Sequence, residues 1–164
     1  MAKNEEKTNV MRVLEQKKIP YVPYHIPIDT AVSGEEMARL MNQDPEQVFK
    51  TLVTVGKTRN HYVFVIPVRL ELDLRKAAKA VGEKSIEMIP QKELLPLTGY
   101  IHGGCSPIGM KKFFTTTIDQ HAGTFQSIIF SAGKVGFQVE VSLPDLAKVI
   151  RYQTADVTAD SAGV

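Results

Sequence analysis

The segment Gly103–Gly109 constrains more than any other how this chain can fold. It reads Gly-Gly-Cys-Ser-Pro-Ile-Gly, and Lys111 and Lys112 follow closely. Glycine lets main-chain N–H groups approach a ligand because it has no Cβ, and proline fixes the bend beside it. Such a loop can direct several donors at one oxygen, on a phosphate or on a carbonyl that is gaining negative charge. The alternative is a tight turn that only connects two elements.

A second constraint is a lysine inside a predicted strand. The segment 49–55 is rich in β-branched residues and lies between Asp44-Pro45 and Gly56, which favours a strand. Alternation separates the two faces. If both faces are covered, the ammonium of Lys50 needs an anion, which a ligand can supply. The alternative is that Lys50 extends from the start of the strand into water. The predicted faces are Phe49, Thr51, Val53 and Val55 on one side, and Lys50, Leu52 and Thr54 on the other.

Capping and periodicity predict a mixture of helices and strands, which indicates the α+β class. Thr8, Ser33 and Asp73 are candidate N-caps, and Gly82 is a candidate helix end. The predicted helices cover 8–18, a short stretch after Ser33, 73–80 and 142–151, and the further predicted strands cover 62–66, 113–118, 125–130 and 135–141.

Length and composition exclude several classes. The 164 residues suit one domain, with 1–7 and 154–164 expected to be mobile tails. A net charge of +2 is too small for a general nucleic-acid binder. One cysteine and four scattered histidines predict no disulfide framework, no metal site and no cofactor. No apolar stretch is long enough to span a membrane and the N-terminus is polar, so we expect a cytoplasmic protein.

Taken together, these residues resemble the YbaK/EbsC family. Its members are free-standing aminoacyl-tRNA deacylases related to the editing domain of bacterial prolyl-tRNA synthetases. The resemblance runs from about residue 10 to about residue 155, and its motifs occur in family order. It implies a mixed, curved, barrel-like β-sheet with helices packed around it, and a cleft between the Lys50 strand and the glycine loop. The matching segments are 49–52, 74–79, 98–112 and 145–149.

Conventional nucleophiles fit this chain poorly. Cys105, paired with His102 or His121, would be a candidate, but cysteine is also a common small buried residue and the family does not require it. Ser106 precedes a proline and lacks the Gly-x-Ser-x-Gly context of a serine hydrolase. The resemblance implies instead that the thiol of a cysteinyl ester attacks its own carbonyl, releases a thiolactone and leaves free tRNA.

The resemblance also implies roles for Lys50 and for three residues of the glycine loop. Lys50 would contact the terminal nucleotide or its ribose, the backbone of Gly103 and Gly104 would bracket the aminoacyl group, and Ser106 would face the carbonyl oxygen. A tyrosine found in some relatives matches either Tyr21 or Tyr24. The remaining substrate-binding candidates are Thr51, Cys105, Pro107, Gly109, Lys111 and Lys112.

Three functions remain open at this point. The first is a deacylase for cysteinyl-tRNA(Pro), and also for cysteinyl-tRNA(Cys). The second is an editing hydrolase for another mischarged tRNA, such as alanyl-tRNA(Pro), acting through an activated water. The third is a relative that binds tRNA or a synthetase without turnover. In each case the expected partner is the 3′ end of an aminoacyl-tRNA, with prolyl-tRNA synthetase as a further candidate.

Overall fold

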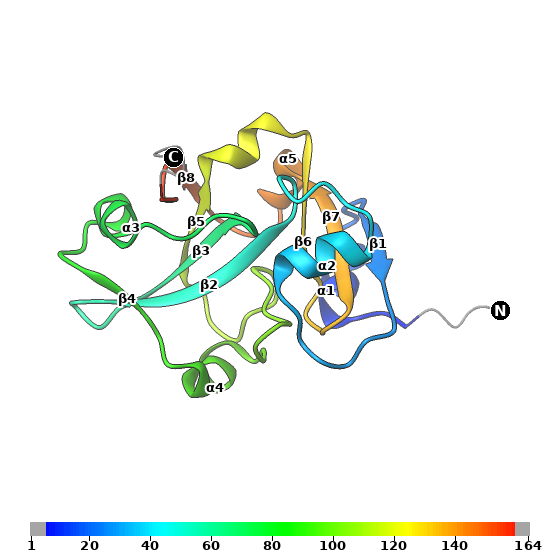
Figure 1. Cartoon of the computed structure of the whole chain (residues 1–164), viewed down its shortest axis with the longest axis horizontal. Coiled ribbons are helices and arrows are strands. Elements are labelled where there is room, and N and C mark those ends of the chain that lie inside the picture. The colour runs from blue at the N-terminus through cyan, green and yellow to red at the C-terminus, as the bar shows by residue number, and fades with distance from the viewer. Residues whose placement is uncertain (1–5, 160–164) are drawn as a thin grey trace.

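The computed structural model of the protein describes residues 6–159, which form two β-sheets surrounded by short helices (Figure 1). The three-stranded sheet is antiparallel and has the order β1-β7-β6. The five-stranded sheet has the order β4-β2-β3-β5-β8 and is mixed, because β3, β5 and β8 are parallel neighbours. The strand bounds are β1 Val22–His25, β2 Phe49–Gly56, β3 His61–Pro67, β4 Ile86–Met88, β5 Thr115–Asp119, β6 Ser127–Ser131, β7 Phe137–Ser142 and β8 Gln153–Ala155.

The helices begin where the sequence places polar caps. The hydroxyls of Thr8 and Ser33 accept hydrogen bonds from the first turns of α1 and α2, and Asp73 does the same for α3. Gly82 ends α3 in the left-handed conformation, with φ of 78°. These caps confirm the predicted helix starts, because each satisfies N–H groups that have no partner within the helix. The helix bounds are α1 Asn9–Gln16, α2 Gly34–Leu40, α3 Leu74–Val81, α4 Leu94–Thr98 and α5 Leu143–Leu146.

Two features of the C-terminal third differ from the prediction. Helix α5 ends at Leu146 rather than near residue 151, because Lys148 and Val149 make i→i+3 hydrogen bonds that tighten the backbone. Residues 153–155 form β8, and Val157 and Thr158 are buried, although 154–164 was predicted to be a tail. The rest of both predicted tails, 1–5 and 160–164, lies outside the described residues.

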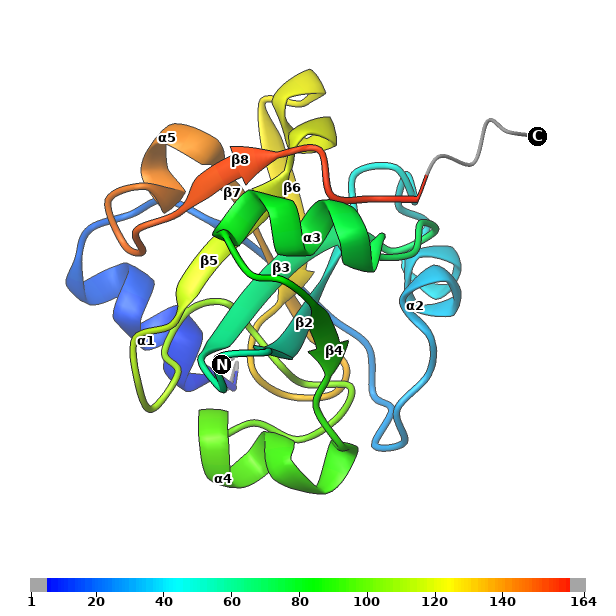
Figure 2. The ribbon, with the colours of Figure 1, turned by 90° about the vertical axis from the view of Figure 1, so that its left-hand side faces the viewer.

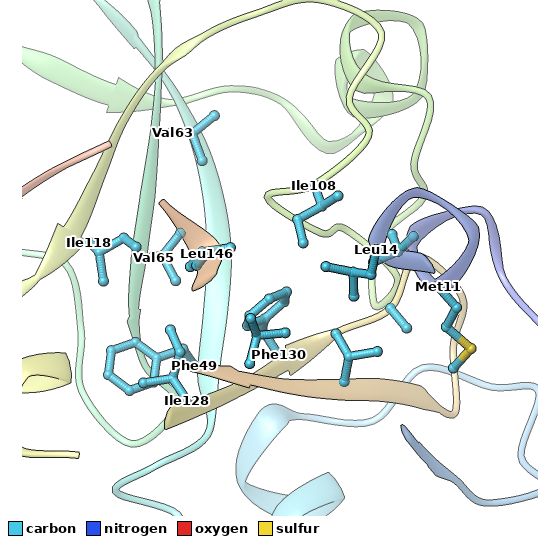
Figure 3. Packing of buried hydrophobic residues seen from close by; sticks show 14 of the residues in the cluster. Met11, Leu14, Phe49, Val63, Val65, Ile108, Ile118, Ile128, Phe130 and Leu146 are labelled. Carbon is cyan, nitrogen blue, oxygen red and sulfur yellow. The ribbon is translucent and has the colours of Figure 1, made fainter. Parts of the chain in front are cut away.

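The main core lies between the two sheets. Phe49 of β2, Phe130 of β6 and Leu14 of α1 lie together in this core (Figure 3). Val53 of β2 belongs to the same cluster. A second cluster fills the space between the opposite face of the five-stranded sheet and α3, which crosses β2 and β3 (Figure 2). Leu52 belongs to this second cluster. Both faces of β2 are therefore covered, which is the condition under which the sequence analysis expected Lys50 to need an anion.

The α+β class with a mixed sheet is confirmed, but the predicted barrel-like sheet is wrong. Within residues 6–159, ladder pairing between the two sheets is limited to one isolated bridge, between Val48, which immediately precedes β2, and Ile129 of β6. Hydrogen bonding does not continue along this contact, so the two sheets stay separate and do not close. Within residues 6–159, no helix has the length and apolar composition that crossing a bilayer requires.

Phe130 tests the core between the sheets. Its side chain is fully buried, so Phe130→Ala should lower the free energy of unfolding by about 3–5 kcal/mol through lost burial and a new cavity. Urea denaturation measures this change. Phe113→Ala is the matched control: its ring is 69% exposed, so the expected change is within about 0.5 kcal/mol. Equal effects of the two substitutions would contradict the assigned core.

Candidate active site

A cavity of about 630 Å³ lies where β2 faces the loop after α4. Its wall contains Lys50 and Thr51 from the strand and Gly103 and Cys105 from the loop. The two features that stand out in the sequence therefore share one cavity, although about fifty residues separate them along the chain. A mostly concave site with a few polar groups is the usual form of a small-ligand or catalytic site.

The unpaired outer edge of β2 forms one wall of this cavity. Strand β4 pairs only with Thr54–Gly56, and Val48 bridges to Ile129 at the other end. The carbonyl of Val53 accepts from the N–H of Ile89, so it points away from β3. Because backbone groups two residues apart point the same way, the N–H and C=O of Thr51 face this open edge. A buried backbone group without a partner is costly, so this edge is suited to bind a polar ligand.

The side chain of Thr51 adds a further open hydrogen-bonding group. Its Oγ1 is buried and has no hydrogen-bond partner among residues 6–159. Thr51 lies on the same face of β2 as Phe49 and Val53, which are both packed in the core. Buried hydroxyls normally have a partner, so an open one on a cavity wall indicates a position that a ligand can satisfy.

Lys50 brings the positive charge to the cavity. Its side chain is 28% exposed, and its Nζ lies 4.0 Å from Oε2 of Glu71, whose side chain is 86% exposed. Within residues 6–159, this is the only carboxylate within ion-pair distance of Lys50. A pair at this distance with one mobile partner in water contributes little, so the ammonium is available to an anionic ligand.

The loop reaches the cavity because Gly103 has no side chain. Its φ is +89°, and a Cβ at this position would lie 2.6 Å from Cβ of Ala31. Gly104 follows with its N–H bonded to the carbonyl of Ile101, and a Cβ there would crowd the backbone of Lys134 at 3.3 Å. Gly103 therefore lines the cavity, whereas Gly104 is buried behind it.

The second half of the loop turns away from this cavity. Ser106 is fully buried, and its Oγ accepts a hydrogen bond from the N–H of Ile108 at 3.3 Å, so it holds the shape of the loop. Ser106 and the following loop residues, 107–112, do not belong to the cavity wall. Pro107, Gly109, Lys111 and Lys112 line a different cavity, of about 530 Å³. The structure thus brings together only part of the predicted site.

The chemistry of Cys105 does not favour a nucleophile. Burial raises the pKa of its thiol to about 12, and a hydrogen bond with Thr98 offsets only part of that rise. Since the thiolate is the reactive form, the thiol is unreactive at neutral pH. Among residues 6–159, no histidine side chain hydrogen-bonds to a serine, threonine or cysteine side chain, and His121 pairs with Asp119 instead. His102 is exposed and lines the cavity without such a partner.

Several residues of the cavity wall were not singled out in the sequence. Gln138 of β7 is buried, and its Oε1 accepts a hydrogen bond of 2.7 Å from Nε2 of Gln43. This bond uses the oxygen of the Gln138 amide, so its NH₂ group is the end that remains for a ligand. Ser131 of β6 also lines the wall, with its Oγ bonded to the N–H of Gly133. A polar residue in an alternating strand normally indicates the solvent face, which hides Gln138 from sequence reasoning.

The two candidate tyrosines lie elsewhere. The hydroxyl of Tyr21 donates to Glu15, and that of Tyr24 donates to Glu140 at 2.7 Å. The bond to Glu140 raises the pKa of Tyr24 to about 12. Neither tyrosine belongs to the cavity wall. Within the described residues, no three histidine, cysteine, aspartate or glutamate side chains cluster in a way that could hold a metal ion.

Fold and cavity together define a small α+β domain with a cavity between a strand edge and a glycine loop. Residues 27–149 match the model of the aminoacyl-tRNA editing domain, and the chain belongs to this family, the YbaK/EbsC group. It is 45% identical over 157 residues to an Enterococcus faecalis protein named "Putative Cys-tRNA(Pro)/Cys-tRNA(Cys) deacylase EbsC", covering 95% of this chain and 96% of that protein.

Solved structures support the same fold. One is titled as a "putative trans-editing enzyme for prolyl tRNA synthetase"; its TM-score is 0.78 at 24% identity, over 92% of this chain and 94% of that one. Another, a hypothetical protein, has a TM-score of 0.83 at 20% identity, over 92% of this chain and 99% of that one. At these identities the likeness concerns the fold.

The reactivity of Cys105 tests the electrostatics of the cavity. With a thiol pKa of about 12, alkylation by iodoacetamide at pH 8 should be roughly a thousandfold slower in the folded protein than in the urea-unfolded chain. The rate should rise about tenfold per pH unit up to pH 10, because the thiolate fraction grows without saturating. The unfolded chain is the control, with a plateau above about pH 9. A plateau near pH 7 in the folded protein would reveal an activated cysteine.

Proposed function

We propose that this protein is a trans-editing deacylase that removes cysteine from mischarged tRNA(Pro), and also from cysteinyl-tRNA(Cys), by attack of the substrate's own thiol. The family membership and the 45% identity to the Enterococcus faecalis protein support the class of reaction. Aminoacyl-tRNAs occur where proteins are synthesised, so the cytoplasm remains the expected compartment. The family resemblance further suggests association with prolyl-tRNA synthetase for tRNA selection.

One observation carries the mechanistic part of the proposal. The cavity offers an ammonium, an open strand edge and a glycine loop, but no side chain activated as a nucleophile. An ester-cleaving site without a nucleophile of its own can act by positioning a nucleophile that the substrate carries. Intramolecular attack in a well-held geometry has effective molarities of about 10⁵–10⁸ M, equivalent to roughly 7–11 kcal/mol of the barrier.

The reaction is balanced without a cofactor. The cysteinyl sulfur attacks the ester carbonyl carbon, and the tetrahedral intermediate carries its charge on the former carbonyl oxygen. The bond from that carbon to the ribose oxygen then breaks, which releases a cyclic thiolactone. The proton lost by the thiol ends on the ribose oxygen, with the neighbouring ribose hydroxyl as a relay. Backbone donors aimed at the developing oxyanion lower the barrier more than they stabilise the ester itself.

Each wall of the cavity has a part in this scheme. Lys50 holds the terminal nucleotide through its phosphate or ribose, and the open edge of β2 at Thr51 binds polar groups of the ester. The backbone of Gly103 brackets the aminoacyl group and limits its size, and Gly104, buried behind it, supports the loop rather than contacting the substrate as the sequence predicted. Ser106 acts through the loop, because its buried hydroxyl fixes the neighbouring backbone. Cys105 contributes to the wall rather than to the chemistry.

The mechanism predicts strong selectivity among esters of similar size. Cysteinyl-tRNA(Pro) should be deacylated rapidly, while seryl- and alanyl-tRNA(Pro) should react slowly, since a hydroxyl is a poorer nucleophile and alanine has none. Methylation of the cysteinyl sulfur should abolish the reaction. Deacylation of purified mischarged tRNAs measures these rates. Rapid clearance of the S-methylated or alanyl ester would instead indicate an activated water, and binding without turnover would indicate a non-catalytic relative.

A second prediction concerns Lys50. Lys50→Ala should lower kcat/KM by roughly 10- to 100-fold, the value of one charge-assisted hydrogen bond to the substrate. Lys57→Ala is the matched control, because Lys57 is exposed just beyond the end of β2 and lines neither cavity. Cys105→Ala should keep most activity. If Cys105→Ala loses activity while Lys50→Ala retains it, Cys105 is the nucleophile and the proposed mechanism is wrong.

A further inference from the structure

The second cavity, of about 530 Å³, has features that the deacylation chemistry does not use. It lies between the segment that leads into β5 and the segment between α5 and β8, which are on the same side of the molecule (Figure 2). Its volume falls within the range of about 300–1,000 Å³ that small-ligand sites occupy. Partly buried apolar residues contribute to its wall: Met110, Phe114, Val149 and Ile150.

All the charged residues that line this cavity are positively charged. Lys111, Lys112 and Arg151 line it, and no aspartate or glutamate does. Within residues 6–159, neither Lys112 nor Arg151 forms an ion pair, and Nζ of Lys111 makes only a long hydrogen bond of 3.4 Å to the carbonyl of Pro96. In a chain whose net charge is only +2, three cations without a neighbouring acid are a local concentration of positive charge. Such a site attracts polyanions.

An aromatic ring lies among these cations. Phe113 lines the cavity, and its ring is 69% exposed. A single exposed ring is common on a protein surface, and what distinguishes this one is its place in a cavity wall beside basic groups, where a base can stack on it. Aromatic rings with lysine and arginine close by are the combination that binds unpaired nucleotides, because the bases stack and the phosphates meet the cations.

The two cavities are neighbours along the glycine loop. Cys105 lines the first and Pro107 lines the second, with only the buried Ser106 between them. Two residues of extended chain span at most roughly 7 Å, so the walls of the two cavities come this close. This distance joins the walls and not the openings: helix α2, beside the first cavity, and the segment between α5 and β8, beside the second, lie on different sides of the molecule (Figure 2). A single strand whose end occupies the first cavity would therefore pass around the loop to reach the second.

We propose that the second cavity binds the unpaired nucleotides just upstream of the aminoacylated terminal nucleotide. One base stacks on Phe113 over the apolar wall, and Lys112 and Arg151 contact phosphates. This inference rests on the proposed function and deepens it, because it assigns the RNA contact to residues distinct from those that hold the ester. It also explains how a nearly neutral protein binds RNA: the positive charge is concentrated where the single strand passes.

Kinetics with two substrates of different length test this site. For cysteinyl-tRNA(Pro), Lys112→Ala/Arg151→Ala should raise KM about tenfold, leave kcat unchanged and lower the slope of log KM against log salt by about 1.4, since two phosphate contacts are lost. Phe113→Ala should raise KM by about 5- to 100-fold through lost stacking, and Phe113→Tyr should restore it. With cysteinyl-adenosine, which lacks the upstream nucleotides, all these variants should match the wild type.

Lys57→Ala/Lys79→Ala is the control, because it removes two exposed charges that line neither cavity. If it raises KM as much, the effect comes from net charge and the proposed site is wrong. An unchanged KM for the tRNA in both cavity variants also overturns the proposal. That result would indicate that the second cavity binds an acidic protein surface instead.

A binding measurement separates this inference from the proposed function. Fluorescence anisotropy measures binding of a single-stranded RNA with the tRNA 3′-terminal sequence and no attached amino acid. The cavity variants should lose RNA affinity by the same factors as they raise KM. If the wild type deacylates neither substrate, the proposed function fails, while the anisotropy result still decides the RNA site. Equal RNA affinity of the wild type and the cavity variants overturns the inference.

Discussion

The unpaired stretch of β2 is the feature on which the rest of the site depends. A strand in the middle of a protein normally satisfies both edges, but here β4 covers only Thr54–Gly56 and the bridge at Val48 ends the contact with β6. In the stretch between them, the peptide groups of Thr51 point to the open edge, and its hydroxyl has no hydrogen-bond partner among residues 6–159. Since unsatisfied buried groups are costly, this gap is suited to a polar ligand, which is the basis of the proposed site.

The same gap explains why the sheets do not close. Continuous pairing of β6 along β2 would make a barrel and fill the cavity with backbone hydrogen bonds. Separation of the two sheets instead leaves room for the glycine loop to approach, and the absence of a Cβ at Gly103 permits contact with Ala31. The core between the sheets, around Phe49 and Phe130, keeps the strand and the loop at a fixed distance.

The cavity combines the ammonium of Lys50 with a cysteine thiol that burial keeps protonated, which suits the proposed reaction, in which the substrate provides the reactive group. Burial keeps the Cys105 thiol protonated, and the hydroxyl of Ser106 serves the loop. An enzyme of this kind gains specificity from chemistry as much as from shape: an ester that fits but lacks a thiol is not cleaved. Recognition of the RNA can then be assigned to a separate basic surface around Phe113.

The sequence by itself determined the features that depend on residues close together along the chain. The caps at Thr8, Ser33 and Asp73 and the alternating faces of β2 follow from local hydrogen bonding and periodicity, and the family motifs identified the class. Only the tertiary structure decided that the sheets remain open, that Gln138 lines the cavity and that the loop divides at Ser106 between two cavities. These outcomes depend on contacts between segments far apart in the chain, whose packing no local pattern encodes.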